Sequence, residues 1–466
     1  MFSYQPVNNH QDLLNVVDGL LLEAGLKRED FGGQITFAGM DPIRPTHLKV
    51  GCASATVSAA NAIASAIIWK HRSGERQDIH IDLRKAYVTQ SPWQDLLAGC
   101  TLVNGTPQMM GGNVGELGSH ILPTRDGRFV ILTSLYASNT ERIMGLLDSG
   151  TLPKQLERAT RKWDAADLEN AAQDAGVPLV ICRTSKEFRA TDQYQRHASA
   201  PLIHIEKIGD SEPEPFLPGT RPLSGVRVLG MTHVVAGPAV LRQLSAQGAD
   251  ALNLNTLNWI EEPTMYWQTQ AGSRQAYMDA RVDGNRKAVY ELVKGSDVFV
   301  ENLRPHLADK QGFSAETLAS IRPGIIYVKI KLNTSTGPWA DWMGYDFTAA
   351  ALCGELTQYR GPCNDMGHAE HANARERSRS REKRFGLAVA NFLNVDKRSA
   401  YLTLILLSCA KFLARTADDQ WHPCVLRRVL QVRSVPLACC PLKLLGQCAA
   451  VQQTHNPFGV RGIERG

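Results

Sequence analysis

The sequence predicts an α/β fold in which Rossmann-like parallel sheets with flanking helices are joined to a smaller α+β domain. Short β-branched stretches, VRVL at 226–229 and DVFV at 297–300, are each followed by a turn and a helical pattern. The chain has 466 residues, 43% of them hydrophobic and 21% charged, so it can bury more than one core. Alternation of strands and helices is typical of a parallel sheet covered by helices.

The first 120 residues are expected to form one part of the α/β core. Residues 53–70 are rich in alanine and other small residues, which suits a closely packed helix, and Ser73 and Gly74 provide a stop signal. Residues 80–83 then alternate in polarity as a strand does.

The small α+β domain is expected at residues 121–208. A turn at 122–127 leads into a strand at 129–135, and helical patterns continue to about residue 200. Residues 209–221 are rich in proline and acidic side chains, so we interpret them as a linker between domains.

Residues 222–360 hold the clearest candidates for a ligand site. Ala236, Gly237 and Pro238 follow a strand at the point where a helix starts, which would direct backbone amides toward a phosphate or carbonyl group; a plain turn is the alternative. Asn302 and Arg304 follow another strand at its carboxyl end, where open α/β sheets place their ligands.

Composition argues against several classes of protein. The N-terminus lacks a basic start and an apolar segment, and the longest apolar run, residues 401–409, is too short to cross a bilayer, so we expect a cytoplasmic protein without a membrane partner. Ten cysteines without CxxC spacing predict reduced thiols. The net charge is +5, but residues 361–466 hold 16 Lys and Arg against 8 Asp and Glu, so the remainder is slightly acidic and no nucleic-acid partner is expected.

The last segment, residues 361–466, has a different character. It contains the charged run RERSRSREKR at 375–384 and six of the ten cysteines, and the strand and helix alternation fades. A solvated charged stretch is the main interpretation of the run, and a nuclear-localisation or RNA-binding segment is the alternative. Cys363, His368 and His371 do not have the spacing of a metal site, so no metal is expected.

Five sequence blocks follow one another along the chain: PLSGVRVL at 222–229, VVAGP at 234–238, DVFVENLRP at 297–305, TGP at 336–338 and GYD at 344–346. Taken in this order, they resemble the N-terminal half of the family III CoA-transferases, a superfamily that also holds formyl-CoA transferases, carnitine CoA-transferases and α-methylacyl-CoA racemases. A second resemblance covers residues 50–84, which are similar to the family's central helix, its Gly-x-x-Gln turn and the next strand. The resemblance implies coenzyme A or an acyl-CoA as substrate and no tightly bound cofactor.

The order of these blocks differs from the family, because the late motifs at 50–84 precede the early motifs at 225–346. We therefore expect the family fold in tandem or permuted order, as in long fungal-type members, with a divergent C-terminus. Residues 221–360 are expected to pack against residues 35–120 and complete one family-like unit. Family members interlock two chains or two halves, which makes a homodimer one expectation.

The resemblance also implies which residues contact coenzyme A. The corresponding positions are Val235, Ala236, Gly237, Pro238, Asn302, Arg304, Lys310 and Lys331. Flexible ammonium groups such as those of the two lysines pair well with phosphates, and ordinary surface lysines are the alternative interpretation.

The family's nucleophile is an aspartate at the start of the small-residue helix, which attacks the acyl-CoA thioester to give a mixed anhydride. The corresponding position in the first half is Cys52, which is either a nucleophilic thiol activated by the helix N-terminus or a buried core cysteine. In the second half the position falls near residue 375, and Asp365 is the nearest aspartate.

Three functions remain open at this point. The leading hypothesis is an acyl-CoA:carboxylate CoA-transferase acting on a small or secondary-metabolite carboxylic acid. An α-methylacyl-CoA racemase or epimerase, which needs an acid/base pair at the α-carbon, is the second. A catalytically inactive remnant that still binds coenzyme A is the third.

Overall fold

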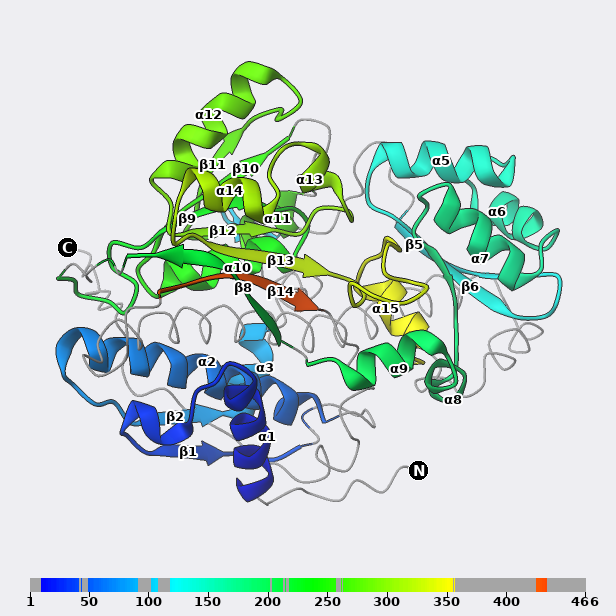
Figure 1. The fold of residues 1–466 in the computed structure, drawn as a ribbon. Helices are drawn as coiled ribbons and strands as arrows, with labels where there is room; N and C mark the ends of the chain where they lie inside the picture. The colour runs from blue at the N-terminus through cyan, green and yellow to red at the C-terminus, as the bar shows by residue number, and fades with distance from the viewer. Residues whose placement is uncertain are drawn as a thin grey trace.

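The computed structural model of the protein describes residues 10–41, 43, 49–90, 102–107, 118–201, 203–212, 214, 218–256, 261, 263–354, 356 and 425–433. Figure 1 shows a main sheet with helices on both faces, a layer beneath it formed by the N-terminal residues, and a smaller domain at the side. The architecture is mixed α/β with parallel sheets, as the sequence predicts.

The main sheet contains seven strands in the order β11-β10-β9-β12-β13-β14-β8 among the described residues. They are β8 (Ile203–Ser211), β9 (Arg227–Met231), β10 (Asp250–Asn255), β11 (Arg274–Tyr277), β12 (Val298–Glu301), β13 (Ile326–Lys331) and β14 (Val425–Arg433). Neighbouring strands are parallel except for the antiparallel pair β14 and β8. The chain moves outward from β9 to β11 and then returns to the other side of β9, so the strand order reverses between β9 and β12.

Helices cover both faces of this sheet. On one face, α12 (Asp283–Lys294) and α14 (Ala315–Ile321) pack around Phe299 and Tyr327, whereas α10 (Ala236–Ala246) lies on the other face with Val298 and Val300 (Figure 1). Successive β12 side chains therefore enter opposite cores, as the pleat of a strand requires. The connections also contain α11 (Pro263–Thr269) and α13 (Leu307–Lys310).

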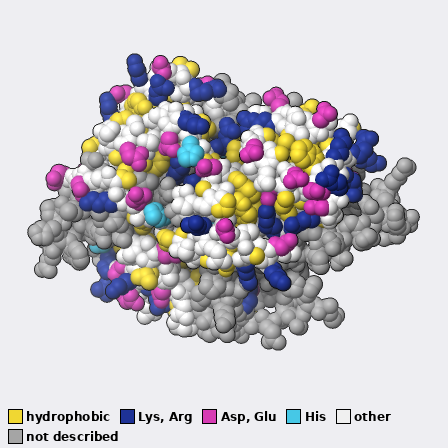
Figure 2. All heavy atoms as spheres, turned by 45° about the vertical axis from the view of Figure 1, so that its right-hand side comes forward, with side chains coloured by type: hydrophobic (Ala, Val, Ile, Leu, Met, Phe, Trp, Pro, Cys, Tyr) yellow, Lys and Arg dark blue, Asp and Glu magenta, His cyan; other side chains and the backbone are white. Residues whose placement is uncertain are grey.

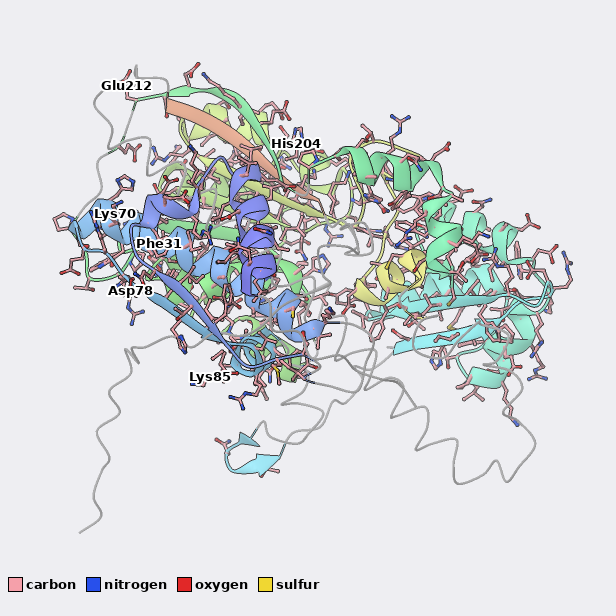
Figure 3. The ribbon with its side chains drawn as sticks, turned by 90° about the horizontal axis from the view of Figure 1, so that it is seen from below. Phe31, Lys70, Asp78, Lys85, His204 and Glu212 are labelled. Carbon is pink, nitrogen blue, oxygen red and sulfur yellow. The ribbon has the colours of Figure 1, made fainter. Side chains whose placement is uncertain are left out.

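The N-terminal layer consists of helices around a small parallel sheet. Its elements are α1 (His10–Glu23), the 3-10 turn η1 (Arg28–Phe31), β1 (Ile35–Ala38), α2 (Val50–Ser73), β2 (Ile79–Asp82) and α3 (Leu83–Gln90). The Lys70 Nζ donates to the Asp30 carbonyl (2.8 Å), and the Asp78 Oδ1 accepts from the Gln34 amide (2.7 Å). Figure 3 shows Lys70 and Asp78 at the same end of the layer as Phe31, which is buried.

Helix α2 connects this layer to the main sheet. Its buried residues share one hydrophobic core with Leu241 and Leu244 of α10 and with strands β9, β12 and β13. At its C-terminal end, the Arg72 Nη2 donates to the Ser224 carbonyl (2.9 Å). The predicted packing of residues 35–120 against 221–360 is therefore present. In the described part of the chain, α2 is the one helix long and apolar enough to cross a membrane, but 89% of the relevant segment is buried inside the protein.

The smaller domain is built on an antiparallel sheet of β5 (Gly118–Pro123), β6 (Phe129–Ser134) and β7 (Leu179–Ile181). Helices α5 (Ala137–Leu147), α6 (Pro153–Thr160) and α7 (Ala165–Asp174) cover it and share its core. Helices α8 (Ser185–Arg189) and α9 (Asp192–Ser199) lead back to the main sheet, and α15 (Asp346–Cys353) packs on β6 and β7. The strands β3 (Leu102–Val103) and β4 (Thr106–Pro107) form a separate hairpin.

Two segments differ from the sequence-based expectation. The linker expected at 209–221 begins inside β8, which continues to Ser211, and Figure 3 labels His204 and Glu212 near the two ends of this strand. The segment 361–466, in which regular alternation fades, contributes β14 to the main sheet between β13 and β8.

Candidate functional site

The candidate site lies at the carboxyl ends of β9 and β12, where the strand order reverses. β9 ends at Met231, and a turn at 232–235 leads directly into α10. Val234 in this turn has a φ of 58°. A β-branched residue rarely adopts this left-handed conformation, and such strain persists only where the surroundings impose it.

Three side chains from separate parts of the chain hold the turn. The Asn302 Oδ1 accepts from the His233 amide and its Nδ2 donates to the His233 carbonyl, both at 2.9 Å. The Val234 amide donates to the Glu261 Oε1 (3.0 Å), and the Thr269 Oγ1 donates to the Val234 carbonyl (3.3 Å). The peptide groups before α10 are thus fixed on both sides of the strained residue.

Tyr136 connects the smaller domain to this turn. It precedes α5, and its hydroxyl donates to the Glu261 Oε1 (2.9 Å) and lies 3.1 Å from the His233 Nδ1. Because the single hydroxyl proton goes to Glu261, the His233 Nδ1 must carry the proton of the second bond. Burial lowers the pKa of His233 to about 4, so the imidazole is neutral at neutral pH.

Gly237 allows α10 to approach the end of β12. A Cβ at this position would lie 2.5 Å from the Thr232 Cβ and 2.7 Å from the Asn302 Oδ1, closer than van der Waals contact permits. The first turn of the helix therefore lies directly against Asn302. A helix N-terminus in this position presents amide groups and a partial positive charge to the crevice at the switch point.

The structure brings some of the sequence-predicted contact residues together. Val235 to Pro238 form the start of α10 beside Asn302, and Arg304 follows two residues later. Lys310 is exposed at the end of α13, and Lys331 is partly buried at the end of β13.

A buried ion pair lies under the same edge of the sheet. The Lys329 Nζ is 3.2 Å from the Glu301 Oε1 and 3.7 Å from the Asp309 Oδ2, and the Glu301 side chain is 1% exposed. Burial raises the pKa of Glu301, while the Lys329 charge opposes the rise. Lys329 is therefore occupied in holding the end of β12 rather than facing a ligand.

Cys52 lies in the first turn of α2, as predicted, and its side chain is completely buried in the core. The alternative interpretation as a core cysteine fits this burial. Asp365, the second candidate nucleophile, lies outside the described residues.

A carboxylate that the sequence did not single out caps α2. Asp41 is 2% exposed, and it accepts hydrogen bonds from the amides of Ile43 (3.0 Å), Gly51 (3.2 Å) and Cys52 (2.7 Å). A Cβ on Gly51 would lie 2.8 Å from the Asp41 Oδ1, so glycine makes this approach possible. The start of the small-residue helix, where the family places its aspartate, is thus occupied by the carboxylate of Asp41.

Sequence reasoning also missed Tyr136, His233 and Glu261. His233 lies between two of the motif blocks, but Tyr136 is 97 residues from His233 and 125 residues from Glu261 along the chain. Sequence gives no direct signal for such contacts, because they depend on how the smaller domain meets the sheet.

Comparison with known proteins gives a family match over about a third of the chain, from residue 223 to residue 370. Residues 223–370 match the family model described as CoA-transferase family III. The acetyl-coenzyme A transferase nodX of Hypoxylon pulicicidum is 24% identical over 266 residues, which are 52% of this chain and 44% of that protein. Formyl-CoA:oxalate CoA-transferase of Streptomyces avermitilis is 30% identical over 149 residues, 30% of this chain and 36% of that protein.

Two further comparisons extend this set. Human succinyl-CoA:glutarate CoA-transferase is 30% identical over 164 residues, 33% of this chain and 37% of that protein. The crystal structure of a CAIB/BAIF family protein from Brucella suis shares 29% identity over 31% of this chain and 40% of that chain, with a TM-score of 0.26. The match with each of these proteins spans less than half of that protein's own length.

Proposed function

Because residues 223–370 match the family model of CoA-transferase family III, we propose that the chain is an acyl-CoA:carboxylate CoA-transferase of this family. The observation that carries the proposal is that the matched segment contains the turn at 232–235, α10 and Asn302 at the switch point of the sheet. Ligands of open α/β sheets bind at this place. Relatives named as CoA-transferases for acetyl, formyl, oxalate, succinate and glutarate groups support a carboxylic acid as acceptor.

In this proposal, coenzyme A lies across the start of α10. The amides of Ala236 and Gly237 face its phosphate or carbonyl oxygens, while Asn302 keeps the turn in place. Arg304, Lys310 and Lys331 supply positive charge for the phosphates. The neutral imidazole of His233 and the Glu261 carboxylate position the turn through Val234 and Tyr136.

The chemistry requires an enzyme carboxylate that attacks the acyl-CoA thioester, which gives a mixed anhydride and the CoA thiolate. The thiolate then attacks the enzyme carbonyl of the anhydride, which releases the donor acid and leaves an enzyme–CoA thioester. The acceptor carboxylate attacks this thioester to form a second mixed anhydride, and the released thiolate attacks its acceptor carbonyl to give the new acyl-CoA and the free enzyme carboxylate. Asp365 is the proposed carboxylate, and Cys52, which is completely buried in the core, is the weaker candidate. Secondary-metabolite acids are a proposed acceptor class, and cytoplasmic location and a homodimer are part of the same proposal.

Intact-protein mass spectrometry tests the proposal. The purified chain is incubated with acetyl-CoA and longer acyl-CoAs, and a covalent acyl or CoA adduct is mapped by peptide digestion. Incubation with acetyl-CoA and a panel of free acids should also yield new acyl-CoA products. Failure to bind coenzyme A at millimolar concentration would contradict the proposal.

A racemase is the second candidate, because His233 and Glu261 meet at the Tyr136 hydroxyl and form a histidine and carboxylate pair at the site. Exchange of the substrate α-proton with solvent deuterium, without transfer of CoA to a second acid, would favour it. CoA binding with neither reaction would favour a non-catalytic remnant.

A further inference from the structure

Two arginines lie on the two sides of the junction between the smaller domain and the main sheet. Arg142 belongs to α5, and Arg304 belongs to the segment after β12. A Cβ built on Gly176 would lie 3.7 Å from the Arg142 Nη1 and 4.0 Å from the Met343 Cε. The Arg304 Nη1 lies 3.7 Å from the sulfur of the same methionine. The Arg142 Nη1 and the Met343 side chain therefore both lie near Gly176, and Met343 in turn contacts Arg304.

Neither guanidinium has a carboxylate partner in the part of the chain that the structure describes. The Arg142 Nη1 donates to the Gly176 carbonyl (3.3 Å), and the Arg304 Nη1 contacts the Met343 sulfur. Many other arginines of the smaller domain and the main sheet form ion pairs; examples are Arg125, Arg183 and Arg274. An unpaired arginine at such a junction has donors available for a ligand.

The pair is electrostatically unfavourable without an anion. Burial lowers the pKa of Arg304, and the charge of Arg142 lowers it further. Two like charges held near each other repel, and an anionic group between them converts the repulsion into attraction. The face in Figure 2 carries groups of Lys and Arg side chains beside hydrophobic ones, interspersed with Asp and Glu side chains.

A hydrogen bond between two uncharged side chains joins the two sides of this junction. The Asn139 Nδ2 donates to the Tyr345 hydroxyl oxygen (3.0 Å), and Asn139 lies one turn before Arg142 on α5. Tyr345 directly precedes α15. This contact holds the face of α5 that carries Arg142 toward the segment 343–345, which Arg304 also contacts.

We propose that Arg142 and Arg304 together bind one anionic oxygen group of the substrates, either a phosphate of the acyl-CoA or the carboxylate of the acid acceptor. Planar guanidinium groups bind both kinds of oxyanion through paired N–H donors. The inference rests on the proposed CoA-transferase function, and it adds a residue of the smaller domain to the substrate site.

Binding measurements on the full chain test this assignment. Coenzyme A, 3′-dephospho-CoA, inorganic phosphate and acetate are titrated calorimetrically into the wild type, Arg142→Ala, Arg142→Lys and Arg304→Ala. Arg158→Ala is the matched control, because Arg158 is an exposed arginine of the same domain whose Nε bonds only the Lys154 carbonyl among the described residues. Loss of one charged hydrogen-bonding partner is expected to weaken binding about 10- to 100-fold.

The two sources of the anion give different results. Weaker binding of coenzyme A and phosphate by Arg142→Ala, with partial rescue by lysine, would indicate a phosphate. An unchanged Kd for coenzyme A, together with a raised KM for the acid and weaker acetate binding, would indicate the acceptor carboxylate. Binding and KM values equal to those of Arg158→Ala would overturn the inference.

The experiment also separates this inference from the proposed function. If the wild type binds no coenzyme A, the proposed function fails. In that case phosphate or acetate binding that requires both Arg142 and Arg304 still supports an anion site, and absence of such binding overturns it. Circular dichroism of each variant confirms that a loss of binding is not a loss of fold.

Discussion

Replacement of Asp41 by alanine should release the N-terminus of α2. The carboxylate accepts from three backbone amides, two of them in the first turn of the helix, and only 2% of the residue is exposed. Water therefore cannot replace the lost bonds without local rearrangement.

The magnitude follows from these contacts. Loss of a helix cap usually costs about 0.5–2 kcal/mol, and a hydrogen bond to a charged group contributes about 1.5–3 kcal/mol. Because several amides lose their acceptor at once, we expect local stability at the start of α2 to fall by about 3 kcal/mol. This change corresponds to roughly 150-fold faster amide exchange.

Hydrogen exchange at Gly51 and Cys52 measures this change directly. Asp78→Ala is the matched control, since Asp78 is exposed and its Oδ1 accepts from the single amide of Gln34. The control should lose less than about 1 kcal/mol, confined to the start of β1. Exchange at Gly51 and Cys52 that rises less than threefold in Asp41→Ala would refute the capping argument.

Three further predictions concern the site and its support. Gly237→Ala places a Cβ 2.5 Å from the Thr232 Cβ, so it should destabilise the turn by about 1–3 kcal/mol and weaken CoA binding. Gly284→Ala is the control, because a Cβ there has open space around it, and it should change neither stability nor binding. Lys329→Met leaves the buried Glu301 without its cation and should cost about 3 kcal/mol in denaturant unfolding, and a second change, Glu301→Gln, should recover part of the loss. The lowered pKa of His233 means that the unfolded chain binds a proton first as the pH falls. The contribution of His233 to the free energy of unfolding is therefore complete above pH 6.5 and falls by about 3 kcal/mol between pH 6.5 and pH 4. Thermal melts of His233→Gln over this pH range should lack this part of the pH dependence.

Local sequence patterns predicted the elements whose structure depends on neighbouring residues. Helix α2 ends at Ser73, where Gly74 adopts a left-handed conformation with a φ of 77° and its amide bonds the Lys70 carbonyl. The strands at Arg227–Met231 and Val298–Glu301 follow from their β-branched residues. Their parallel pairing follows from the helices between them.

Contacts between distant segments could not be predicted in this way. Asp41 is ten residues before Gly51, so no capping pattern of adjacent positions identifies it. The bond between Tyr136 and Glu261 depends on the placement of the smaller domain beside the sheet. β14 pairs with β13 and β8 although nothing in the charged and cysteine-rich segment indicated a strand of this sheet.

Helix α2 also has a mechanical consequence. It contains 24 residues and is therefore about 36 Å long, and its first residue, Val50, packs with α15 and the smaller domain while the rest of its buried face packs under the main sheet. Because a rigid helix moves as one body, a tilt of α2 at its N-terminal end also displaces its C-terminal end. A change in packing of the smaller domain around Val50 would therefore shift the α2 residues that pack against β9 and α10, because no hinge lies between them.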